Sequence, residues 1–187
     1  MILSQNTMPS RSVGVDFALD TNRINTRKAL PSMNRLERWD QERVILLVIS
    51  ETALAECYAP KRAEKASNYI FTRDRLRAPE EYERLRKIEA VLFPGVGAKN
   101  KNKKNDVRIA FNASKYGDIL ITADGASNCQ SGGILGNRAG LEALGIRVMT
   151  DSEAVAFVEG LIRHRDDHAR RVSLATLSPL PAWVGKD

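Results

Sequence analysis

The sequence predicts an α/β fold: a three-layer α/β/α sandwich around a central parallel sheet of the Rossmann type. Short apolar runs rich in Val, Ile and Leu alternate with segments of helical periodicity. The runs are almost wholly apolar, which is typical of parallel strands covered by helices on both faces. Polar or acidic residues follow these runs, and no internal repeat indicates another architecture.

Two strands and their helices are predicted in the N-terminal part of the chain. Residues 13–20 form an apolar run that ends on polar residues, as a buried strand leaving a sheet does. A helix is expected to begin near Pro31 and to reach residue 40. The run at 44–49 (VILLVI) predicts a central strand, after which Ser50 caps a helix over residues 51–57.

The middle of the chain predicts two helices, a loop and a third strand. Residues 79–92 carry acidic residues early and basic ones late, as the helix dipole prefers. Residues 93–105 combine helix breakers with lysines and predict an exposed loop. Asp106 is expected to open the next helix, Gly117 to close it, and residues 119–122 to form a strand.

The C-terminal part predicts a short helix over 138–144 and a strand over 146–149. Asp151 or Ser152 is expected to cap a last helix, which runs from residue 153 to about residue 164. The domain organisation predicted from these elements is an N-terminal extension (1–12), one domain (13–172) and an irregular or docked tail (173–187), since 187 residues suit one domain.

The composition favours some partners and leaves certain sites without a signal. Lys and Arg number 29 against 23 Asp and Glu, a net charge of +6 that favours polyanionic partners, although a solvated surface is the alternative reading. The two cysteines, Cys57 and Cys129, and the two histidines, His164 and His168, lack the spacing of a disulfide framework or a zinc site. We therefore expect a cytoplasmic protein with no membrane segment.

Acidic residues lie where a parallel sheet builds its functional edge. Asp20 ends the first predicted strand, Glu51 and Glu56 follow the second, Asp124 follows the third, and Asp106 opens a helix that points to the same edge. Carboxylates that converge there repel one another unless protons or cations neutralise them, and oxygen ligands select Mg2+ or Mn2+. The alternative is that each acid is a helix cap or a turn residue.

Four segments together resemble the PIN-domain nucleases, a family that includes the toxins of many prokaryotic toxin and antitoxin pairs. They are residues 19–22 (LDTN), 49–56 (ISETALAE), 106–110 (DVRIA) and 119–124 (ILITAD). The resemblance spans about residues 13–149. It implies a PIN-like fold and a Mg2+- or Mn2+-dependent endoribonuclease that hydrolyses single-stranded RNA.

The resemblance also implies roles for individual residues. Asp20, Glu56, Asp106 and Asp124 match the acidic quartet that binds metal and carries catalysis. Asn22 and Thr122 match residues that support the quartet. Glu51 is a second candidate, and the Leu-Ala-Glu pattern favours Glu56 over it because the two cannot face one metal equally well.

Partners are predicted from the resemblance and from the surface. Four lysines are expected to hold the RNA backbone, with a solvated loop as the alternative: Lys99, Lys101, Lys103 and Lys104. An antitoxin or another regulatory protein is a second expected partner, and a symmetric homodimer a third. The tail's apolar residues would serve such an interface or dock on their own domain: Leu177, Leu180, Trp183 and Val184.

Two other functions stay open. A phosphohydrolase of the haloacid dehalogenase type also has an Asp after its first strand, but it needs a second Asp two residues later, where Asn22 stands. A non-catalytic scaffold would keep the fold and bind RNA or a protein. Cys129 has no neighbouring histidine to activate it and is predicted to be a turn residue.

Overall fold

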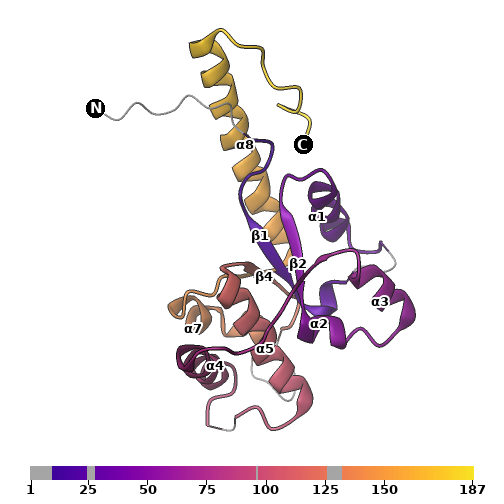
Figure 1. Ribbon diagram of the computed structural model, residues 1–187, viewed down its shortest axis with the longest axis vertical. Coiled ribbons are helices and arrows are strands. Elements are labelled where there is room, and N and C mark those ends of the chain that lie inside the picture. The colour runs from indigo at the N-terminus through magenta and orange to yellow at the C-terminus, as the bar shows by residue number, and fades with distance from the viewer. Residues whose placement is uncertain (1–9, 25–27, 96, 126–131) are drawn as a thin grey trace.

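The computed structural model describes residues 10–24, 28–95, 97–125 and 132–187 (Figure 1). Within these ranges, five parallel strands form one sheet in the order β3-β2-β1-β4-β5. The strands are β1 (Asp16–Leu19), β2 (Leu46–Ser50), β3 (Ile70–Thr72), β4 (Ile119–Ile121) and β5 (Val148–Met149). Helices cover both faces of the sheet, so the predicted α/β/α sandwich is confirmed.

The register of the central strands places the C-terminal ends of β1, β2 and β4 at one level of the sheet. Leu19 pairs with Ile49 of β2 on one side and with Ile121 of β4 on the other. The strand order reverses direction at β1, since the chain moves from β1 out to β3 and then returns to β4. Parallel sheets form their functional crevice at such a switch point, which here lies between the ends of β1 and β4.

The helices after β1 and β2 begin where they are predicted, although α2 ends at Ala55, two residues before the predicted end. Helix α1 (Pro31–Gln41) begins with a proline, whose missing N–H costs nothing in a first turn, and buries Met33, Leu36 and Trp39. Helix α2 (Glu51–Ala55) is capped by Ser50, whose side chain accepts a hydrogen bond from the N–H of Ala53. Helix α4 (Pro79–Leu92) has the predicted bounds.

The predicted loop at 93–105 is wrong over its last five residues. Helix α5 (Lys101–Tyr116) begins inside it, so Asp106 lies in the second turn of a helix and does not open one. The Asn100 side chain accepts a hydrogen bond from the N–H of Lys103 and caps α5, and lysine is itself a good helix former. Gly117 ends α5 with φ at +76°, as predicted.

Several short elements were not predicted. They are the 3-10 helix η1 (Thr21–Arg23), α3 (Pro60–Ala66), the edge strand β3 and α6 (Gly133–Gly136). Ile70 and Phe71 of β3 are both exposed, so this strand has no continuous buried run to reveal it. Helix α7 (Arg138–Ala143) and strand β5 lie within their predicted ranges.

The last helix is longer than predicted and has a different cap. Helix α8 (Asp151–Thr176) starts after Thr150, which forms a capping box with Glu153, so neither Asp151 nor Ser152 is the cap. Its buried residues continue to Val172, which explains why it runs on past residue 164. None of the helices in the described part of the chain is long and apolar enough to cross a bilayer.

The end of the tail docks on α8. Trp183 lies under the guanidinium of Arg165, 4.4 Å from the ring centroid, and the N–H of Gly185 donates to Asp166. The expectation that the tail is irregular from residue 173 is therefore corrected, because α8 includes its first residues. Leu177 and Leu180 are exposed, so docking accounts for only part of the apolar set.

Candidate active site

Asp20 lies at the switch point and is held there by two polar side chains. Its Oδ2 accepts hydrogen bonds from the hydroxyl of Thr122 (2.6 Å) and from Nδ2 of Asn22 (2.7 Å). Asn22 also accepts from the N–H of Ala123, which ties η1 to the chain leaving β4. The structure thus brings Asp20, Asn22 and Thr122 together, as the resemblance implies.

Glu56 joins this group and Glu51 does not. Glu56 follows the last residue of α2, where its Oε2 accepts from the hydroxyl of Thr21 and its Oε1 from Nδ2 of Asn105, both at 2.6 Å. Thr21 and Asn105 are the chain neighbours of Asp20 and Asp106. Glu51 is exposed in the first turn of α2, and no hydrogen bond joins it to these neighbours among the described residues, so the geometry favours Glu56 as the quartet member.

Two hydrogen bonds position Asp124, one through its backbone N–H and one through its carboxylate. Its N–H donates to the hydroxyl of Thr122, and its Oδ2 accepts from the N–H of Ile134 at the start of α6. Gly133 makes this approach feasible: its φ is +55°, and a Cβ there would collide with the carbonyl oxygen of Gly125. Gly133 therefore serves the placement of Asp124.

The pKa values of two acids indicate that the quartet acts as one electrostatic cluster. The pKa of Asp106 is raised to about 7, first by burial and then by the charges of Asp20, Asp124 and Glu56, against a smaller opposing effect of Lys103. The pKa of Asp20 is raised to about 6 by burial; the Thr122 hydrogen bond opposes this, and Asp124 and Glu56 add to it. Glu56 and Asp124 thus lie close enough to Asp106 and Asp20 for their charges to oppose the ionisation of those two acids.

The donor chemistry of the cluster suits a hard divalent cation, since all its ligand atoms would be carboxylate oxygens. Within the described ranges, however, no set of three His, Cys, Asp or Glu side chains is close enough to hold one ion directly. The hydrogen bonds of Glu56 and Asp124 turn their carboxylates toward protein donors. Because Mg2+ retains several waters and is commonly held through one or two carboxylates, the cluster still fits such an ion.

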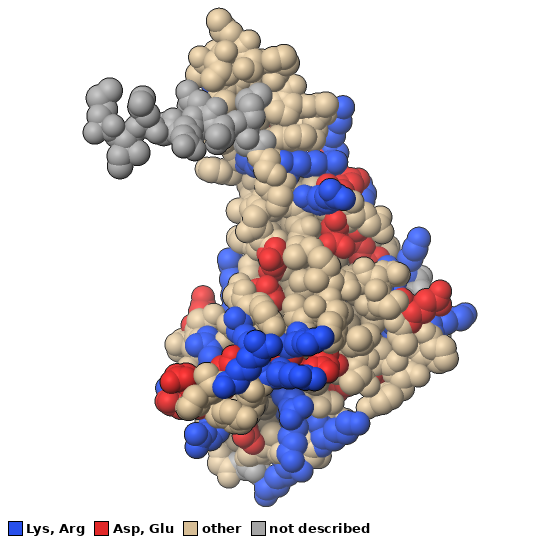
Figure 2. Space-filling model, viewed as in Figure 1, with Lys and Arg blue, Asp and Glu red and all other residues tan. Residues whose placement is uncertain are grey.

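The four lysines are distributed around the start of α5 and do not form a single loop patch. Lys99 precedes the helix and is exposed, as is Lys104. Lys103 lies over the ring of Phe93, with its Nζ 5.1 Å from the centroid. Lys101 donates from Nζ to the Tyr58 hydroxyl (3.0 Å) at the rim of a cavity. Figure 2 shows Lys and Arg side chains gathered on the face of the molecule that carries α4 and α5.

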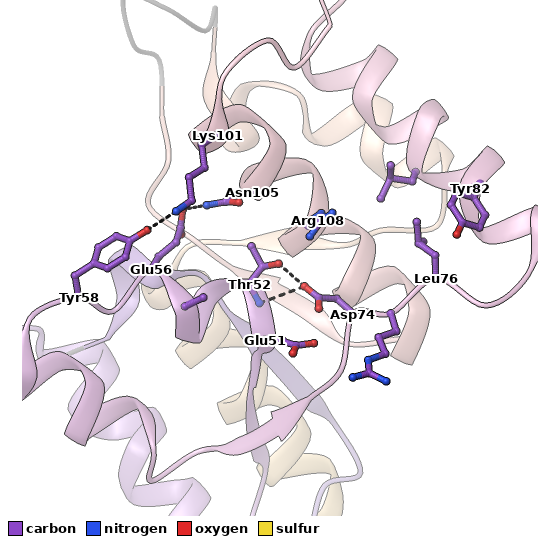
Figure 3. Close-up of a pocket in the computed structure, with 13 residues that line it drawn as sticks. Glu51, Thr52, Glu56, Tyr58, Asp74, Leu76, Tyr82, Lys101, Asn105 and Arg108 are labelled. Atoms are coloured by element: carbon purple, nitrogen blue, oxygen red, sulfur yellow. Dashed lines mark hydrogen bonds between the residues drawn. The ribbon is translucent and has the colours of Figure 1, made fainter.

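The sequence prediction missed Thr21, Asn105 and a cavity beside Glu56. The first two adjoin predicted acids in the sequence, which is the signal that could have found them. The cavity, of about 620 Å3, lies between α2, the segment 74–76, α4 and α5 (Figure 3). It depends on β3 and on the early start of α5, neither of which was predicted. Cys129 lies outside the described residues.

Comparisons with known proteins add little. No protein-family model matches the sequence, and no curated protein matches it. The chain is similar to one in a solved structure described as "Crystal structure of VapBC2 from Rickettsia felis bound to a DNA fragment from their promoter", with a TM-score of 0.46, 16% identity, and coverage of 73% of this chain and 98% of that one. A likeness at this level carries no argument for function, and the sheet topology itself defines the fold.

Proposed function

We propose that this protein is a divalent-metal-dependent endoribonuclease that hydrolyses phosphodiester bonds of single-stranded RNA at Asp20, Glu56, Asp106 and Asp124. One observation carries the proposal: four acids lie together at the switch point of a parallel sheet, where burial and then the charges of the other three raise the pKa of Asp106. Such mutual repulsion has a cost in folding and is typical of functional sites. A cation that occupies the cluster would remove it.

Asp20, Glu56 and Asp106 would hold Mg2+ or Mn2+, and Asp124 would complete the set. The ion would supply an activated water and would stabilise charge on the phosphate oxygens. Around it, Thr122 and Asn22 fix the orientation of Asp20, while Thr21 and Asn105 fix that of Glu56. Lys101 and Lys103 supply positive charge on the α5 side, where an RNA phosphate would approach.

The test is cleavage of a mixed-sequence single-stranded RNA, with Mn2+ and with a chelator, by the wild type and by Asp20→Asn, Asp106→Asn and Asp124→Asn. We expect metal-dependent cutting by the wild type and its loss in all three variants. Asp118→Asn is the matched control. Asp118 is also a buried acid, and burial and the charge of Asp16 raise its pKa. It lies at the opposite end of the strands, just before β4 begins. Its variant should keep cutting.

Two outcomes would replace this proposal. Mn2+ binding without RNA cleavage, lost in the same variants, would favour a phosphohydrolase that acts on another phosphoester. Absence of both binding and cleavage would favour a non-catalytic scaffold. The haloacid dehalogenase type has its second Asp at the position of Asn22. Here Asn22 donates hydrogen bonds to Asp20 and Thr122 and so orients Asp20, which weighs against that type.

Other partners and the location of the protein are part of the same proposal. An antitoxin or a different regulatory protein should co-purify with the tagged chain from the cytoplasm of its native host. A homodimer should be visible by size-exclusion chromatography with light scattering. The exposed Leu177 and Leu180 are the first residues to substitute if a dimer is found.

A further inference from the structure

The cavity of about 620 Å3 shares a residue with the acidic cluster. Glu56 lines the cavity and accepts hydrogen bonds from Thr21 and Asn105, the neighbours of Asp20 and Asp106. A polymer bound across the acidic cluster on the side of Glu56 therefore reaches the cavity. Its volume lies within the range of roughly 300–1,000 Å3 that holds small-molecule-sized groups, so a nucleotide fits.

Two tyrosines with exposed rings line this cavity. Tyr58, after α2, is 73% exposed, and Tyr82, on α4, is 51% exposed. Tyr58 is held from α5, because Lys101 Nζ donates to its hydroxyl and lies 5.5 Å from its ring centroid. Figure 3 shows the two rings at opposite ends of the cavity. Exposed aromatic faces in a groove are the usual stacking platforms for unpaired bases.

Positively charged side chains from α5 and from the segment 73–77 also line the cavity. Lys101 and Arg108 come from α5, and Arg75 comes from the segment 73–77. Side chains of α5 hold that segment by its carbonyl oxygens: Lys115 donates to Arg75 (2.7 Å) and Tyr116 to Arg73 (2.8 Å). The arginines of this segment are exposed and alternate with half-buried residues.

Among the described residues, the carboxylates in the cavity wall form no ion pair with these cations. Asp74 accepts hydrogen bonds from the backbone N–H and the hydroxyl of Thr52 at the start of α2. Glu56 is bonded to Thr21 and Asn105. Glu51 lies on the side of the cavity away from Lys101 (Figure 3). The part of the cavity near Lys101 and Arg108 thus suits a phosphate, and the tyrosine rings suit bases.

We infer that this cavity binds the nucleotides of single-stranded RNA that flank the cleavage point, with Tyr58 and Tyr82 stacking on bases and Arg75, Lys101 and Arg108 contacting phosphates. The inference rests on the proposed function for the position of the cut, but it concerns binding and is testable without metal. Duplex RNA would bind less well, because its bases are paired and its faces are not available to the tyrosines.

The experiment measures binding of a fluorescein-labelled single-stranded RNA by anisotropy in EDTA, and quenching of a 2-aminopurine placed within the same RNA. Tyr58→Ala and Tyr82→Ala should each weaken binding by roughly tenfold and reduce the quenching. Tyr58→Phe and Tyr82→Phe keep the ring and should retain most of both signals. Leu174→Ala, at an exposed position on α8, is the control.

A second pair of variants tests the phosphate contacts. Arg75→Gln and Arg108→Gln should weaken binding and lower the salt dependence of the affinity, by about one counterion each. Arg171→Gln, an exposed charge on α8, should leave both unchanged.

The inference is overturned if both alanine variants, shown to be folded by circular dichroism, bind and quench like the wild type. That result with intact metal-dependent cleavage would leave the proposed function standing. Binding that depends on the tyrosines, in a protein that cuts no RNA, would overturn the proposed function and leave the cavity assignment standing.

Discussion

The hydroxyl of Thr122 donates a 2.6 Å hydrogen bond to Oδ2 of Asp20, and so joins the ends of β4 and β1. The hydroxyl oxygen of Thr122 in turn accepts a hydrogen bond from the N–H of Asp124 (2.9 Å). One hydroxyl therefore fixes the positions of two acids that come from opposite sides of the switch point. It also lowers the pKa of Asp20, which burial raises.

Thr122→Val should keep the shape of this residue and remove its hydroxyl. We expect the pKa of Asp20 to rise further and Mn2+ affinity to fall by about 10- to 100-fold, as when a residue that orients a ligand is lost. The free energy of unfolding should fall by about 1–2 kcal/mol. Isothermal titration with Mn2+ and a pH profile of cleavage check this. Thr122→Ser should restore both, and an affinity in Thr122→Val equal to that of the wild type would contradict the assignment.

Asp106→Asn should stabilise the metal-free protein at neutral pH. The folded-state pKa of Asp106, about 7, exceeds its ordinary value of 3.8, so the folded state binds its proton more tightly than the unfolded state does. The stability linked to this carboxyl is therefore present at low pH and is lost as the pH rises from about 4 to about 7. The gain in Asp106→Asn at pH 8 should be on the order of 1–2 kcal/mol, since partial exposure reduces the effect.

Urea unfolding of the wild type and Asp106→Asn in EDTA, at pH 5 and pH 8, measures this gain. Mn2+ should reverse the order of the two proteins, because it stabilises only the wild type. A variant less stable than the wild type at pH 8 in EDTA would count against mutual repulsion in the cluster.

Asn105→Ala should impair the site without removing any acid. Nδ2 of Asn105 donates to Oε1 of Glu56 at 2.6 Å, so the variant frees that carboxylate to rotate. We expect Mn2+ affinity to fall by about tenfold or more, with α5 still formed. Asn102→Ala, at an exposed position in the first turn of α5, is the control. Equal Mn2+ affinities in the two variants would show that Asn105 plays no part in holding Glu56 for the ion.

Asp118→Asn should raise stability and leave cleavage intact. Burial and the charge of Asp16 raise the pKa of Asp118 to about 6, and its Oδ2 has no hydrogen-bond partner among the described residues. The stability linked to this carboxyl is lost as the pH rises from about 4 to about 6. The variant should therefore gain on the order of 1 kcal/mol at pH 7 and nothing at pH 3. Thermal unfolding at both pH values measures the gain.

The sequence predicted the parts of the fold that have long, strong patterns. The buried runs that contain β1, β2 and β4 and the periodic α1 and α4 lie where the residues indicated. The edge strand β3 is not predicted from the sequence, because Ile70 and Phe71 are exposed and only three of its residues pair with β2. The sequence prediction places the start of α5 too late because it assigns the lysines to a loop, although lysine favours a helix once Asn100 caps it.

The candidate site was predictable from strand ends, and its supporting contacts were not. The rule that functional residues follow parallel strands led to Asp20, Glu56 and Asp124. The choice of Glu56 over Glu51 depends on the geometry of one turn of α2, which the Leu-Ala-Glu pattern indicated. Asn105 and the tyrosine cavity need the packing of α5 against α2, since they join residues about fifty positions apart.

Electron paramagnetic resonance of Mn2+ added to the wild type and to Asp106→Asn tests the central claim most directly, because free and bound Mn2+ differ in signal. We predict saturable binding by the wild type at neutral pH and its loss in Asp106→Asn, with Asp118→Asn unchanged. Equal binding by all three proteins, or no binding by the wild type, would contradict a metal site at the four acids.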